Sequence, residues 1–116
     1  MSVPKVFESE YRFCQVLWEH EPISSRELSE LCKDQLGWSK TTTYTVIKRL
    51  SDRGVVKNEK TIVTSLVSKE EVQASEIDEL VEKKFGGSVP AFIAAFAKSK
   101  KLNEKEIEEI RRIIGE

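Results

Sequence analysis

The stretch WSKTTTYTVIKRLSDRG, residues 38–54, constrains the fold more than any other part of the chain. Ser39 stands at a favourable helix N-cap position, and Gly54 can adopt the left-handed conformation that ends a helix. Between them, apolar residues recur at helical spacing and predict a buried stripe. This stripe consists of Val46, Ile47 and Leu50, with Thr43 at its edge. The stretch therefore predicts a helix whose two ends are both encoded in the sequence.

The opposite face of this helix is polar. At about 100° per residue, the helix directs hydroxyl groups and charges away from the stripe. The residues on this face are Thr41, Thr45, Lys48 and Asp52, flanked by Thr42 and Arg49. An ordinary solvated face would favour Glu, Lys or Ala, because threonine lowers helix propensity. We therefore predict that the face contacts nucleic acid, which suits hydroxyls and cations; the alternative is a plain solvated surface.

Two shorter helices are predicted before this one. The first covers about residues 7–20 and is closed by Pro22. Its apolar face consists of Tyr11, Cys14, Leu17 and Trp18. The second begins at Ser24, an N-cap residue with Glu27 as its capping-box partner, and it ends before Gly37. The three helices thus follow one another through short connections.

The segment after Gly54, VVKNEKTIVTSLV, is rich in β-branched residues and has Asn58 near its middle. This composition predicts a short hairpin. Three helices followed by a hairpin is the order of a winged helix-turn-helix, in which the third helix enters the major groove of DNA and the hairpin, or wing, lies against the backbone. We therefore predict a mainly α fold, with a winged helix-turn-helix DNA-binding domain over residues 1–68.

The remainder of the chain predicts further helices, each with a narrow apolar stripe. Helices this short are marginal in water, and a second copy of the chain would cover their stripes. We therefore predict a C-terminal helical dimerisation region over residues 69–116. Its predicted contact residues are Leu80, Phe92, Phe96, Ile107, Ile110 and Ile114. The alternative is that the stripes pack against the winged helix of the same chain.

Charge is distributed unevenly, although the formal net charge of the 116 residues is only −1. Residues 38–60 contain six Lys and Arg against two acids, whereas residues 68–82 contain six acids against one Lys. The positive segment is the one that would attract the phosphate backbone of DNA. The predicted DNA-binding residues are Lys40, Thr41, Thr42, Thr45, Lys48, Arg49 and Arg53.

The remaining reactive residues favour no other chemistry. Cys14 and Cys32 fall at apolar helical positions, so we expect buried thiols, and with His20 they match no zinc-binding spacing. We predict no metal, no other cofactor and no enzyme, because one histidine without a Gly-rich phosphate loop makes no catalytic constellation. No signal-peptide core or membrane-spanning run is present, so we expect a cytoplasmic protein without a membrane partner.

Several segments give the chain a family resemblance: ESEYRFCQVLWEH, ISSRELSELC, WSKTTTYTVIKRLSDRG and LVEKKFGGSVPAFIAAFAKSKKLNEKEIEEIRRII. They resemble the bacterial penicillinase and methicillin-resistance repressors together with the copper-transport repressor, the BlaI/MecI/CopY family. The resemblance implies a homodimeric winged-helix repressor that binds dyad-symmetric operator DNA. It also implies operator contacts by Thr42, Thr45 and Arg49, with Thr41 where lysine is common and Lys40 where proline is common.

The chain departs from this family pattern in three places. Its hairpin is several residues shorter than the family's glycine-tipped wing. No cysteine follows Cys32, so copper sensing through a cysteine-rich hook is not expected. Ala95-Phe96 replaces the Asn-Phe bond at which penicillinase repressors are cleaved, so the sequence identifies no inducing protease or sensor. The alternative function is a winged-helix protein-interaction module without sequence-specific DNA binding.

Overall fold

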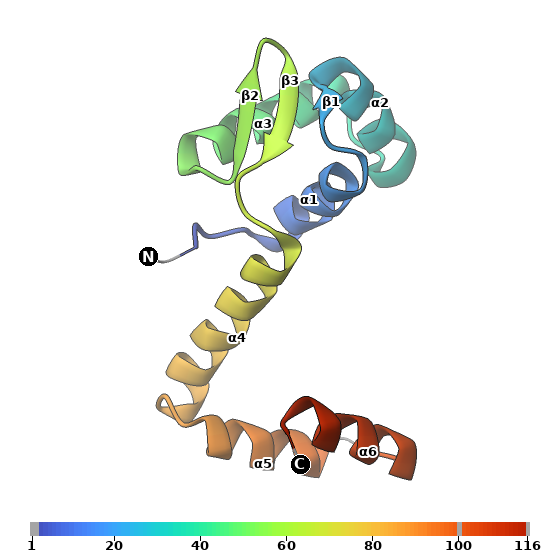
Figure 1. Cartoon of the computed structure of the whole chain (residues 1–116). Helices are drawn as coiled ribbons and strands as arrows, with labels where there is room; N and C mark the ends of the chain where they lie inside the picture. Colours follow the sequence, from blue (N-terminus) through green and yellow to red (C-terminus); the bar gives the residue numbers. More distant parts are fainter. Residues whose placement is uncertain (1–2, 100, 116) are drawn as a thin grey trace. The chain divides into compact units, whose positions relative to one another are not determined.

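Contacts within the chain divide it into two units, residues 1–76 and residues 77–116. The structure, a computed structural model, describes residues 3–99 and 101–115. The boundary between the units falls inside helix α4 (Lys69–Phe85). The first unit combines helices with a small antiparallel sheet, and the second is helical (Figure 1). The mainly α fold is therefore confirmed.

Both ends of the predicted third helix are confirmed. The helices of the first unit that precede the hairpin are α1 (Glu8–His20), α2 (Ser25–Leu36) and α3 (Lys40–Arg53). The Ser39 hydroxyl caps α3 by accepting a hydrogen bond from the Thr42 N–H at 3.1 Å. Gly54 ends α3 with a φ angle of 83°. The Ser24 hydroxyl caps α2 in the same way, through the Glu27 N–H at 3.1 Å.

The sheet consists of three short strands in the order β1-β3-β2: β1 (Ile23–Ser24), β2 (Val56–Glu59) and β3 (Ile62–Ser65). The predicted hairpin is confirmed as β2 and β3. Its turn lies at Lys60 and Thr61, which both have positive φ angles of 52° and 66°. Asn58 lies within β2, opposite Val63. On the other side of β3, Val63 also pairs with Ile23 of β1, a strand that the sequence analysis does not predict.

The core of the first unit lies between its helices and its sheet (Figure 1). Its fully buried side chains include Phe13, Leu17, Leu28, Leu50 and Val63. The predicted stripe of α3 is buried, as expected. Thr43 is predicted at the edge of that stripe, but it is 0% exposed and belongs to the core. One face of α3 is thus buried in the core.

The second unit contains the end of α4 followed by α5 (Val89–Ser99) and α6 (Glu104–Ile113). Capping boxes begin both α4 and α6, formed by Ser68 with Glu71 and by Asn103 with Glu106. Phe85 packs edge-to-face on Phe92, with ring centroids 5.6 Å apart. None of the described residues of α5 or α6 is buried. Within the described ranges, no helix has the length and apolar character needed to cross a membrane.

Candidate nucleic-acid interface

The outward face of α3 brings six of the seven predicted DNA-binding residues together on one side of one helix. All six have exposed side chains: Lys40, Thr41, Thr42, Thr45, Lys48 and Arg49. The opposite side of α3 is anchored in the core, where Leu50 is 0% exposed and Ile47 is 3% exposed. Because this packing prevents α3 from rotating about its axis, the polar side chains keep a fixed direction.

The first turn of α3 is held in place by its cap and by Trp38. The Trp38 ring stacks on Phe13, with ring centroids 6.1 Å apart and an interplanar angle of 4°. The Ser39 hydroxyl, which caps the helix, also donates a hydrogen bond to the Thr42 hydroxyl oxygen at 2.9 Å. The Thr42 hydroxyl therefore keeps its own hydrogen for a partner outside the helix. A phosphate oxygen is one acceptor that suits this donor.

The three cations of this face are weakly engaged within the chain. Lys48 pairs with Asp52 at 3.7 Å, and both side chains are largely exposed, so solvent screens the pair. The Lys40 ammonium lies 5.6 Å from the centroid of the Tyr44 ring. The Arg49 guanidinium forms no ion pair or hydrogen bond with any residue that the structure describes. All three cations can turn to a DNA phosphate or base with little loss of internal bonding.

Arg53, the seventh predicted residue, has a different role. Its guanidinium pairs with the Glu10 carboxylate and donates a hydrogen bond to the Lys5 carbonyl oxygen at 2.7 Å. The same group lies 5.2 Å from the centroid of the Phe7 ring. The Glu10 side chain is only 4% exposed, and that of Arg53 is 29% exposed. These contacts attach α3 to α1 and leave the Arg53 guanidinium less available to DNA than the other six predicted residues.

Tyr44 is a candidate that the sequence analysis does not select. It lies on α3 between Thr41 and Thr45, and it is 37% exposed although the other large apolar residues of this helix are buried. Its spacing of four residues from both Lys40 and Lys48 places it beside the predicted face, and this spacing is the signal that could have identified it.

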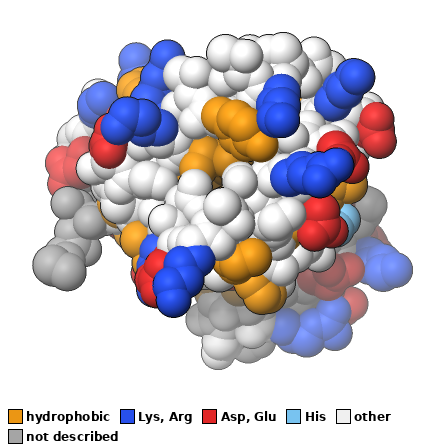
Figure 2. Space-filling model, turned by 90° about the horizontal axis from the view of Figure 1, so that it is seen from above, with side chains coloured by type: hydrophobic (Ala, Val, Ile, Leu, Met, Phe, Trp, Pro, Cys, Tyr) orange, Lys and Arg blue, Asp and Glu red, His pale blue; other side chains and the backbone are white. Residues whose placement is uncertain are grey.

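The wing tip is tied to the start of α2. The Ser25 N–H, at the start of α2, donates a hydrogen bond at 2.8 Å to the carbonyl oxygen of Thr61 in the turn of the hairpin. Lys57 of β2 pairs with Glu59 at 2.9 Å, and Lys60 is exposed at the turn itself. Figure 2 shows the molecule from above the wing, with Lys, Arg, Asp and Glu side chains interspersed around apolar and uncharged groups. The wing thus offers few cations.

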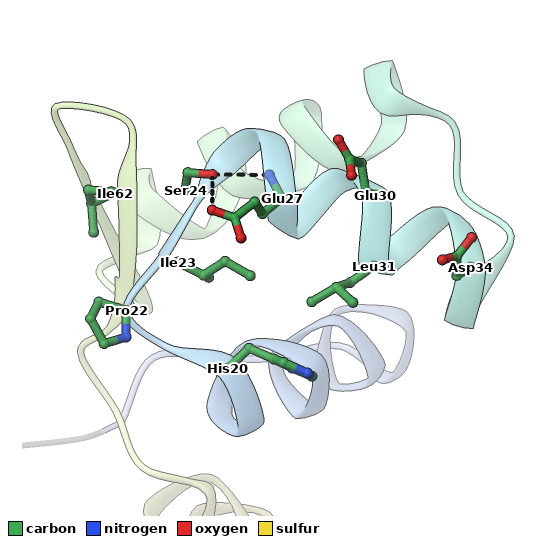
Figure 3. Close-up of a pocket in the computed structure, with 9 residues that line it drawn as sticks. All are labelled: His20, Pro22, Ile23, Ser24, Glu27, Glu30, Leu31, Asp34 and Ile62. Carbon is green, nitrogen blue, oxygen red and sulfur yellow. Dashed lines mark hydrogen bonds between the residues drawn. The ribbon is translucent and has the colours of Figure 1, made fainter.

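A groove of about 680 Å³ lies between the end of α1, the start of α2 and the wing (Figure 3). Its floor is apolar, with Ile23, Leu31 and Ile62, but three carboxylates of α2 line it: Glu27, Glu30 and Asp34. These acids would repel DNA phosphates, so the groove does not extend the interface. Within the described ranges, no group of three or more His, Cys, Asp or Glu side chains is placed to hold a metal ion.

The two thiols lie in the core of the first unit. Cys14 is 1% exposed and Cys32 is 0% exposed, as the sequence predicts. Burial raises the pKa of Cys14 to about 12, and the nearby Glu10 carboxylate adds to the effect. Burial also raises the pKa of Cys32. Neither thiol is available as a nucleophile at neutral pH, because the thiolate is the reactive form.

The second unit leaves large apolar side chains in contact with solvent. Among the predicted dimerisation residues, Leu80 is 41% exposed, Phe96 is 37% exposed and Ile114 is 70% exposed. The other three, Phe92, Ile107 and Ile110, are half-buried. Ala95 and Phe96 lie inside α5, so a protease acting at their bond would have to open this helix. Apolar side chains that stay exposed in one chain remain available for contact with a partner.

Comparison with known proteins finds a matching family. The sequence model of the family described as "Penicillinase repressor" matches residues 7–116. A penicillinase repressor of Staphylococcus aureus is 25% identical over 112 residues, which cover 93% of this chain and 89% of that protein. The methicillin resistance regulatory protein MecI of the same organism is 24% identical over 115 residues, with 96% of this chain and 94% of that protein covered.

The fold is similar to that of a solved structure. This is the solution structure of the monomeric form of Bacillus licheniformis BlaI in complex with the blaP half-operator. The TM-score is 0.53 and the sequence identity is 22%, over 60% of this chain and 90% of that chain. The similarity confirms the winged-helix fold.

Proposed function

This chain belongs to the penicillinase repressor family, and we propose that it is a homodimeric transcriptional repressor that binds dyad-symmetric operator DNA through α3. One of its relatives is a penicillinase repressor, and one structural neighbour is bound to a half-operator. The operator-binding residues that we propose are Lys40, Thr41, Thr42, Thr45, Lys48 and Arg49.

The observation that carries this proposal is the pairing of a rigid inner face with a polar outer face on α3. Buried Ile47 and Leu50 fix the helix, so its backbone needs no rearrangement when the outward side chains bind. Capping by Ser39 holds the first turn, which recognition helices direct towards base edges. Preorganisation of this kind favours reading of a DNA sequence over loose contact with its backbone.

The residues of this face suit different parts of DNA. The Arg49 guanidinium can donate two hydrogen bonds to guanine O6 and N7. The Thr42 and Thr45 hydroxyls can donate to phosphate oxygens, and their methyl groups can contact thymine. The Lys40 and Lys48 ammonium groups suit phosphates. Contacts to the DNA backbone would therefore fix the position of α3 on each half-site, and a few side chains would read the bases.

Dimerisation is supported by the second unit. Its exposed apolar residues would be buried by an identical surface related by two-fold symmetry. Two copies of α3 held by one dimer would contact two half-sites about one helical turn apart. An operator with dyad symmetry is the sequence that matches this arrangement. We also propose that the chain is not an enzyme, because its single histidine and its two buried thiols make no catalytic constellation.

Binding of the full-length chain to a duplex tests the proposal. The probe is a labelled duplex of random sequence, and its length of about 30 base pairs is sufficient for both halves of a dimer to bind. Fluorescence anisotropy should show binding at about 50 mM salt and a much weaker affinity at about 200 mM salt, because each neutralised phosphate releases counterions. The absence of binding at the lower salt concentration would refute DNA recognition.

The second candidate function is a winged helix that binds only proteins. The net charge of −1 and the short wing favour it, because both weaken attraction to phosphate. Selection of duplexes from a random library separates the two functions. A repressor should enrich one dyad-symmetric sequence, whereas a protein-interaction module should enrich none.

A further inference from the structure

Tyr44 stands apart from the other large side chains of α3. It is 37% exposed, whereas Val46, Ile47 and Leu50 are all 7% exposed or less. A tyrosine loses side-chain freedom in a helix, and more than a third of this one stays outside the core. Its ring instead lies under the Lys40 ammonium, 5.6 Å from the ring centroid. The core therefore accounts for only part of the side chain at this position.

The neighbours of Tyr44 place its ring at the edge of the proposed DNA-binding face. Lys40, Tyr44 and Lys48 are spaced four residues apart, so they form one row along α3 beside Thr41 and Thr45. The two lysines suit phosphates on one side of the groove. A ring held between them would lie against base edges close to that strand.

The chemistry of the major groove indicates which base such a ring would contact. Guanine, adenine and cytosine present hydrogen-bond donors and acceptors there, and only thymine presents a methyl group. An aromatic face buried against polar atoms would desolvate them without compensation, whereas a methyl group gains from the contact. We propose that Tyr44 contacts a thymine methyl group in each half-site and thereby selects a T·A base pair. This inference rests on the proposed function.

Duplex selection with three forms of the full-length chain tests this role. Wild type and Tyr44→Phe should both enrich sequences with thymine at one fixed position of each half-site. Tyr44→Ala should lose the preference at that position alone and keep the preferences at the others. Leu66→Ala, which shortens an apolar side chain of 54% exposure outside α3, is the matched control and should keep every preference.

Replacement of the selected thymine by deoxyuridine removes only the methyl group. Wild type and Tyr44→Phe should lose about fourfold in affinity for one half-site, the factor expected for one buried methyl group, and about 16-fold for two. Tyr44→Ala should lose less than about twofold, because the ring that contacts the methyl group is absent. Wild type should bind a duplex with 5-methylcytosine at this position, which keeps the methyl group, more tightly than a duplex with cytosine there.

Two results would overturn the inference while leaving the proposed function intact. One is an equal loss of affinity for wild type and Tyr44→Ala when deoxyuridine replaces the selected thymine. The other is a uniform loss of affinity on all sequences for Tyr44→Phe, which would assign the tyrosine hydroxyl to a phosphate. If wild type enriched no duplex at all, the proposed function would fail, and the assignment of Tyr44 would fail with it.

Discussion

Arg53, the last residue of α3, forms an ion pair with Glu10 of α1 although 43 positions separate them in the sequence. Glu10 also accepts a hydrogen bond from the Phe7 N–H at 2.9 Å. One buried carboxylate thus connects the start of α1 to the end of the proposed recognition helix. A buried ion pair seldom adds much net stability, but it disfavours arrangements that separate its charges.

The first prediction concerns this pair. Arg53→Met should lower the free energy of unfolding by about 3 kcal/mol, because it leaves the Glu10 carboxylate buried without its partner. Urea unfolding measures the loss. Lys48→Met is the matched control, since it removes an exposed pair with Asp52, and it should lower stability by less than about 1 kcal/mol. Equal stability of Arg53→Met and wild type would show that the pair does not hold α3.

The second prediction concerns the inner face of α3. Leu50 is 0% exposed, so Leu50→Ala should leave a cavity and lower the free energy of unfolding by about 2–5 kcal/mol. DNA affinity should change little at a temperature where the variant is folded, because the outward side chains remain. Thr45→Ala should instead weaken DNA binding and change the free energy of unfolding by no more than about 0.5 kcal/mol. A stable Leu50→Ala variant that fails to bind DNA would contradict this separation of the two faces.

The third prediction concerns pH. Native Cys14 keeps its proton up to a pH of about 12, whereas an unfolded thiol ionises near 9.0. Between these values the unfolded state binds fewer protons, so the free energy of unfolding should fall as pH rises, by at most about 1.4 kcal/mol per pH unit for one thiol. Urea unfolding between about pH 8 and pH 11 measures the slope. Cys14→Ala should show a shallower decline, and an unchanged slope would refute the assignment.

The fourth prediction concerns the second unit. Ile110→Asp should convert the dimer to a monomer, because it would place an unpaired charge in an apolar interface. Sedimentation at micromolar concentration measures the change. Glu108→Gln alters an exposed residue of the same helix and should leave the dimer intact. A monomeric wild-type chain at that concentration would rule out this interface.

Features that depend on neighbouring residues could be predicted from the sequence. Ser39 and Gly54 mark the ends of α3 through local backbone chemistry, and both positions are confirmed. The turn at Lys60 and Thr61 carries neither Gly nor Asn, so the sequence offers no signal that would locate it. The role of Arg53 could not be predicted either, because its partner is remote in the sequence.

Arg49 provides the most direct test of the central claim that the outward face of α3 binds DNA. Its exposed guanidinium bonds to no described residue, so Arg49→Ala should leave the fold intact. Circular dichroism and sedimentation of the variant should match those of wild type. These two measurements ensure that any loss of binding comes from the side chain itself.

The measurement is the anisotropy titration of wild type and Arg49→Ala on the duplex that wild type selects. If Arg49 reads a base, its replacement should weaken binding by about 1–3 kcal/mol and relax the preference at one position. If Arg49 contacts a phosphate, affinity should fall evenly across sequences and the salt dependence should flatten. An unchanged affinity for Arg49→Ala, and likewise for Thr45→Ala, in a folded dimer would contradict the assignment of α3 as the recognition helix.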